Sequence, residues 1–162
     1  MLLKAALIVP LAAIIYEDFR YRAIHWIWVA LLALGAALFF PLHWPSVGLN
    51  LGFLAIQGIL LTLYFSIRQG TWINITHDYL GIGDVVFFLP LCLLFSPVNL
   101  ILFFVVGLSL SLIGFLGFCW LTRREIATVP LAGCLAVILI PLLIGTYYFE
   151  WSLHRDLFLN FI

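Results

Sequence analysis

Long apolar segments are the feature of this sequence that most limits its fold. Residues 47–67 and 98–121 each form a predominantly apolar stretch, longer than the roughly 18 residues that indicate a transmembrane helix. The whole chain is 66% hydrophobic and only 9% charged, whereas soluble domains carry about 25% charged residues. We therefore predict an integral membrane protein whose single membrane-embedded domain covers residues 1–162. Any functional site must then be formed by helix ends and short loops.

Six apolar segments predict an all-α fold with six transmembrane helices. Proline, glycine and short polar stretches separate the segments, as is typical of helix ends and turns. The segments cover approximately residues 2–16, 24–40, 47–67, 82–95, 98–121 and 127–149.

The basic residues predict the orientation of these helices. Alternate connections between helices lie on opposite membrane faces, and one face collects Arg20, Arg22, Arg68, Arg123 and Arg124. The other face carries only Lys4 and Arg155. Because cytoplasmic loops are enriched in Lys and Arg, we expect the first face to be cytoplasmic and both termini to lie outside. The expected location is the inner (cytoplasmic) membrane of the cell.

Two carboxylates are predicted to share one membrane depth on the cytoplasmic side. Asp18 ends the first segment and Asp84 begins the fourth, so the two acids can meet if these segments touch. Ionisable groups at a membrane boundary are costly and usually face a cavity or the bundle interior. Two adjacent carboxylates cannot both ionise cheaply, and such a pair suits general acid–base catalysis. Alternatively, both are interfacial charges that pair with Arg20 and Arg22.

Glycines precede the second of these carboxylates in the sequence Gly81-Ile82-Gly83-Asp84. Glycine lacks a side chain and allows another backbone to approach closely. Gly81 and Gly83 are therefore expected to give a peptide substrate room beside Asp84. A short glycine motif alone has low specificity, and here its position at the start of an apolar helix adds weight.

This stretch resembles the G-x-G-D motif of intramembrane aspartyl proteases, and more narrowly that of type IV prepilin and preflagellin peptidases. The family's first motif has an aspartate at the end of helix one and an isoleucine at the head of helix two. Asp18 and Ile24 match that layout, and Glu17 would miss it by one residue. The entry to the last segment, residues 128–133, also resembles the family. At His25, Trp26 and Val86 the family usually has Pro, Asn and Lys.

The resemblance implies an aspartic endopeptidase that cleaves the N-terminal leader of type IV pilin-like precursors. Asp18 and Asp84 would be catalytic, and Gly81 and Gly83 would bind substrate. The layout is that of the compact form without the methyltransferase and zinc insertion, so no metal or cofactor is expected. The partners would be a leader-bearing membrane protein precursor and the lipid bilayer. The formal net charge of zero gives no reason to expect nucleic-acid binding.

Several alternatives stay open. The chain could be a non-catalytic membrane assembly or scaffold homologue, or a small ion- or proton-coupled transporter that uses its buried carboxylates. His77 and Asp78 with the two aspartates match a zinc site poorly, because structural zinc prefers tetrahedral sets of His and Cys. Small residues share one face of the fifth segment, and they indicate either a homodimer seam or packing within the bundle: Gly107, Ser111 and Gly114, followed by Phe118.

Overall fold

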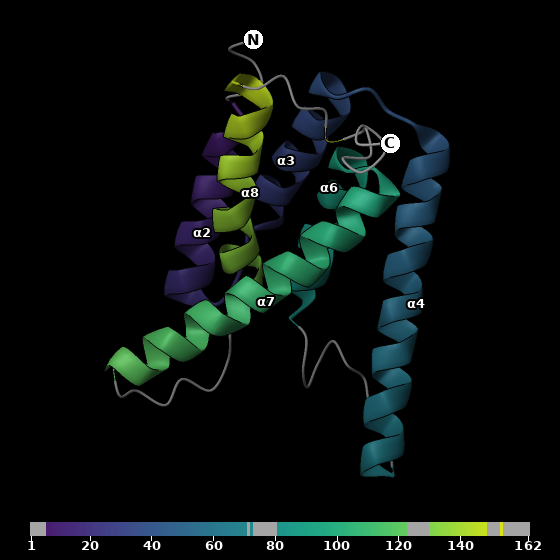
Figure 1. The fold of residues 1–162 in the computed structure, drawn as a ribbon, viewed down its shortest axis with the longest axis vertical. Coiled ribbons are helices and arrows are strands. Elements are labelled where there is room, and N and C mark those ends of the chain that lie inside the picture. Colours follow the sequence, from purple (N-terminus) through teal and green to yellow (C-terminus); the bar gives the residue numbers. More distant parts are fainter. Residues whose placement is uncertain (1–5, 71, 73–80, 123–129, 149–152, 154–162) are drawn as a thin grey trace, which may run out of the picture.

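The fold is all-α, as the sequence predicts. The computed structural model describes residues 6–70, 72, 81–122, 130–148 and 153 (Figure 1). Six helices occur within these residues: α2 (Ile8–Tyr21), α3 (Trp26–Phe39), α4 (Trp44–Gln69), α6 (Ile82–Leu94), α7 (Pro97–Thr122) and α8 (Leu131–Tyr148). Each overlaps one predicted segment. Some residues used for the orientation and metal hypotheses lie outside the described residues: Lys4, His77, Asp78, Arg123, Arg124 and Arg155.

Two of the described helices, α4 and α7, are long and apolar enough to cross a membrane. The 26 residues of α4 extend about 39 Å at 1.5 Å per residue, which exceeds a hydrocarbon core of about 30 Å. Only 11% and 28% of their apolar windows are buried, so most of this apolar surface is open to the surroundings. The other four helices are shorter, and α6 with 13 residues extends only about 20 Å.

The helices alternate in direction, and this places three helix ends together. Figure 1 shows α2, α3, α6 and α8 grouped in a bundle, with α7 crossing obliquely and α4 to one side. Within the bundle α8 packs mainly against α2, and α6 packs mainly against α3. The C-terminal end of α2 and the N-terminal ends of α6 and α8 lie at the lower end in Figure 1. Both candidate aspartates belong to this end of the bundle.

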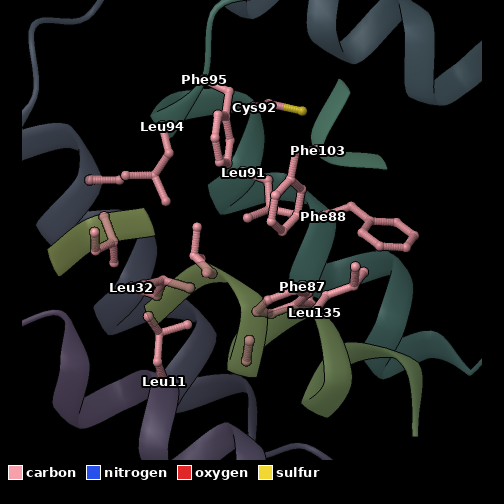
Figure 2. Packing of buried hydrophobic residues seen from close by; sticks show 14 of the residues in the cluster. Leu11, Leu32, Phe87, Phe88, Leu91, Cys92, Leu94, Phe95, Phe103 and Leu135 are labelled. Carbon is pink, nitrogen blue, oxygen red and sulfur yellow. The ribbon is translucent and has the colours of Figure 1, made fainter. Parts of the chain in front are cut away.

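The core is an apolar cluster contributed by five helices. Figure 2 shows buried side chains from α2, α3, α6, α7 and α8 meeting around α6. Leu11, Leu32, Phe87 and Leu135 are all completely buried. Because tightly packed cores resist small displacements, this cluster fixes the position of α6, and with it the position of Asp84, relative to α2 and α8.

Asn50 joins α4 to the C-terminal end of α6. Its buried side chain donates through Nδ2 to the carbonyl oxygens of Cys92, at 3.0 Å, and Phe95, at 2.8 Å. The last carbonyls of a helix have no intrahelical partner, so this amide satisfies two acceptors that would otherwise lack one. Val47 and Asn50 are the buried residues of α4. The amide is therefore a principal attachment of α4 to the bundle.

Replacing Asn50 with Leu is expected to lower the free energy of unfolding by about 2 kcal/mol, because each acceptor left without a partner costs about 1–3 kcal/mol. Thermal unfolding in detergent, followed by circular dichroism, measures the change. Thr62→Val is the matched control, because the Thr62 hydroxyl donates within α4, to the Gly58 carbonyl at 2.7 Å. The control should change stability by less than about 0.5 kcal/mol. Equal losses in both variants would contradict the attachment.

Candidate active site

Asp18 lies in the last turn of α2 and is only 6% exposed. The helix continues beyond the apolar segment that the sequence indicated and ends at Tyr21. Arg22 follows in a left-handed conformation, with φ of 54°, and its backbone N–H donates to the Asp18 carbonyl at 3.2 Å. This is the common left-handed termination of a helix. The chain therefore turns away directly after the aspartate.

Asp84 lies in the first turn of α6 and is half-buried. The helix is capped by Gly81, whose carbonyl accepts a hydrogen bond from the Asp84 N–H at 3.0 Å. An acidic side chain in the first turn interacts favourably with the positive end of the helix dipole. The motif thus forms the start of a helix, as expected from its place before an apolar run.

The N-terminus of α8 brings the two carboxylates together. The Gly133 N–H donates to Asp18 Oδ2 at 2.6 Å, and the Ala132 N–H donates to Asp84 Oδ1 at 3.0 Å. The first N–H groups of a helix have no intrahelical partner, and the helix dipole favours anions there. Two consecutive peptide groups of α8 therefore each hold one carboxylate. Of the family-like entry at 128–133, residues 128 and 129 lie outside the described residues.

The route by which the acids meet differs from the one that the sequence suggested. The sequence made their meeting depend on contact between the first and fourth segments. In the structure α2 packs chiefly on α8 and α6 chiefly on α3, and the start of α8 bridges the two acids. The two carboxylates are close enough to repel each other, and the Arg22 guanidinium attracts the Asp18 carboxylate.

Both carboxylates line a single cavity of about 350 Å³. All four residues that the sequence assigned to the site contribute to its wall: Asp18, Gly81, Gly83 and Asp84. The rest of the described lining includes Arg22, Ile24 and Val86. We call this space the carboxylate cavity. Its volume falls in the range of about 300–1,000 Å³ that is typical of small-ligand sites.

Each of three glycines has a distinct environment. A Cβ added at Gly81 would lie 3.3 Å from Asp84 Oδ2, and one added at Gly83 would lie 3.4 Å from Ile24, an ordinary contact. A Cβ at Gly133 would lie only 3.0 Å from Asp18 Oδ2 and from the Phe19 ring. Gly133 therefore permits the hydrogen bond to Asp18. Gly133 ends the family-like entry at 128–133, but the sequence indicated no role for it at the site.

Glu17 has a different partner from its neighbour. Its carboxylate accepts hydrogen bonds from the His25 backbone N–H at 2.8 Å and from Trp28 Nε1 at 3.0 Å. These contacts attach the end of α2 to the start of α3. The spacing to Ile24 favoured Asp18 over Glu17 as the site residue. Of these two acids, Asp18 is the one that lines the carboxylate cavity.

The arrangement can support proton transfer at a bound molecule, because one carboxylate can accept a proton while the other donates one. Among the described residues, no group of three or more His, Cys, Asp or Glu side chains could hold a metal ion. Comparisons with protein-family models, with curated proteins and with solved structures gave no match to this chain. Its function is therefore inferred from its own residues.

Proposed function

We propose that the chain is a membrane aspartic endopeptidase, similar to a prepilin peptidase, that cleaves the N-terminal leader of type IV pilin-like precursors. One observation carries the proposal. Asp18 and Asp84 come from two helices that are distant in the sequence, yet they line one cavity and bind consecutive N–H groups of α8. Paired carboxylates at a shared cavity are the machinery that an aspartic protease requires.

The two carboxyl groups would act as a pair on a water molecule and a peptide bond. One carboxylate takes a proton from water, and the resulting hydroxide equivalent attacks the peptide carbon. The other carboxyl group donates its proton to the carbonyl oxygen. Collapse of the tetrahedral intermediate breaks the C–N bond, and the leaving amine takes up a proton. The shared proton belongs to the pair of Asp18 and Asp84 and not to either residue alone.

The proposed setting is the inner membrane, with six spanning helices, both termini outside and the site at the cytoplasmic boundary. Arg20 and Arg22 lie at the end of α2 that carries Asp18, and Arg68 lies in the last turn of α4, which runs in the same direction as α2 in Figure 1. These arginines support this orientation. The exposed apolar surfaces of α4 and α7 support a lipid environment. A precursor with a basic leader followed by an apolar helix would present its cleavage site at this boundary.

Reconstitution of the wild-type protein in liposomes with a pilin-like precursor tests the proposal. We expect mass spectrometry to find a free leader and a shortened precursor, cut between the basic leader and the apolar helix. A transporter would instead conduct protons across the liposome membrane and leave the precursor intact. A scaffold would bind the precursor without cutting it. Either of these results would overturn the proposed activity.

Gly83→Ala should separate a role in substrate binding from a role in packing. The added methyl group makes only an ordinary contact with Ile24, and Ala favours a helix over Gly by about 1 kcal/mol. The variant should therefore be at least as stable as the wild type. If Gly83 gives the substrate backbone room, kcat/KM for the precursor should fall about tenfold, mainly through KM. Wild-type kinetics would remove Gly83 from the proposed substrate site.

A further inference from the structure

A second cavity lies next to the carboxylate cavity, between the end of α2, one face of α7 and the start of α8. Its volume is about 520 Å³, and nearly all of its described lining is apolar. We call it the apolar cavity. It is separate from the carboxylates, and the mechanism proposed above does not use it.

The apolar cavity is elongated along two helices. Its lining positions on α7 fall between residues 110 and 118. Those on α8 fall between residues 134 and 138, and Pro130 lines it directly before that helix. On both helices they recur at intervals of three or four residues, so each helix contributes one face. Eight residue steps correspond to about 12 Å along a helix. A groove with this shape suits an apolar helix that lies alongside α7 and α8.

The two cavities share a wall. Arg22 lines both of them, and Phe19, which lies beside Asp18, lines the apolar cavity. The apolar cavity also begins at Pro130, directly before the α8 residues that hold the carboxylates. A chain bound in one cavity can therefore continue into the other.

Two small residues in the wall favour a peptide helix as the occupant. An added Cβ at Gly114 would meet no atom of the described residues within 4 Å, so the space beside it is open to them. Ser111, on the same face of α7, also has a small side chain and lines the cavity. Because the two cavities share a wall, a helix whose preceding residues lie in the carboxylate cavity can continue along this face, whereas a lipid acyl chain has no such link to the carboxylates.

We propose that the apolar cavity binds the apolar helix of the substrate, on the C-terminal side of the bond that is cut. This inference rests on the proposed endopeptidase function and adds its specificity site. The leader and the scissile bond then occupy the carboxylate cavity, and the following helix lies between α7 and α8. Small residues at Ser111 and Gly114 allow the close approach by which helices associate in membranes.

Gly114→Leu tests the proposal, with Gly117→Leu as a matched control. Both glycines lie on α7, and both are exposed. Among the described residues neither has an atom within 4 Å of an added Cβ, and of the two Gly114 alone lines the apolar cavity. In Gly114→Leu we expect kcat/KM for the precursor to fall about tenfold or more through a higher KM, with kcat nearly unchanged. Gly117→Leu should match the wild type.

A second measurement locates the helix directly. Asp84→Asn protein is mixed with precursors that carry single cysteines along the apolar helix, and disulfide formation is induced. A cross-link to Cys134, which lines the cavity, is expected at positions spaced three or four residues apart, and Cys134→Ser should remove it.

The outcomes separate the two proposals. If the wild type cuts no precursor, the endopeptidase function is wrong. If the wild type cuts the precursor but Gly114→Leu has the same kcat/KM and no cross-link to Cys134 forms, only the helix-binding role is overturned. A fall in kcat at constant KM would also count against it, because that result indicates disturbed carboxylates.

Discussion

Asp18→Asn and Asp84→Asn are each expected to reduce precursor cleavage by about 10³-fold or more, because proton transfer by one positioned group contributes about 10²–10⁴-fold. An asparagine side chain keeps an oxygen that can accept the hydrogen bond from α8, but it cannot exchange the proton that hydrolysis requires. The variants should therefore fold and insert normally. Single-turnover assays on purified protein, with thermal unfolding as the folding check, measure the effect.

Glu17→Gln is the control that tests whether Asp18 or its neighbour Glu17 is the catalytic acid of α2. Glu17 is adjacent to Asp18, but its carboxylate bonds to the start of α3 and does not line the carboxylate cavity. Glutamine retains an oxygen that can accept one of these bonds, so cleavage should stay within about threefold of the wild type. If Glu17→Gln loses activity and Asp18→Asn retains it, Glu17 is the catalytic acid of α2, and the assignment of that role to Asp18 is wrong.

Gly133→Ala is expected to lower the cleavage rate by about 10- to 100-fold, because displacement of a catalytic group by about 1 Å can cost 10²-fold. The added methyl group would lie 3.0 Å from both Asp18 Oδ2 and the Phe19 ring. Either the carboxylate or the helix must then shift. We expect the effect in kcat, measured with saturating precursor.

Gly107→Ala distinguishes this displacement from general damage to packing. Gly107 is also tightly packed, and an added Cβ would lie 2.7 Å from the Leu135 side chain, but it does not line the carboxylate cavity. This contact lies within the bundle, as one of the two explanations for the small residues on the fifth segment predicted. Gly107→Ala should lower stability and leave kcat almost unchanged. Equal losses of kcat in the two variants would show that Gly133 has no specific part in positioning Asp18.

The helices could be located from the sequence because their signals are local. Residues 82–95 were expected to form a helix, and α6 is Ile82–Leu94, since Gly81 and the pair Ser96-Pro97 mark its ends. The first helix was expected at residues 2–16, but α2 begins at Ile8 and continues to Tyr21. Its last turn is polar, and in an apolar segment a polar run indicates the end of a helix. Contacts of Glu17 with the start of α3 and of Asp18 with α8 stabilise this end of the helix, and the contact with α8 is distant in the sequence.

The two aspartates and the register at Asp18 could also be predicted, because carboxylates in an apolar chain are rare and the spacing to Ile24 is specific. A Cβ added at Gly83 would lie 3.4 Å from Ile24, and both residues line the carboxylate cavity, so residues of the two motifs lie close together. The role of Ala132 and Gly133 could not be predicted. Their function lies in backbone N–H groups, which every residue except proline has. Only the tertiary arrangement shows which of these groups point at a carboxylate.

The start of α8 also fixes the spacing of the two N–H groups that hold the acids. Ala132 and Gly133 are joined by one peptide bond, so their Cα atoms are about 3.8 Å apart whatever the side chains around them do. The start of α8 therefore sets the spacing of the two donors, while the packing of α2 and α6 sets the positions of the carboxylates that these donors hold. A displacement of α8 would disturb both hydrogen bonds at once, so the two acids would lose their donors together.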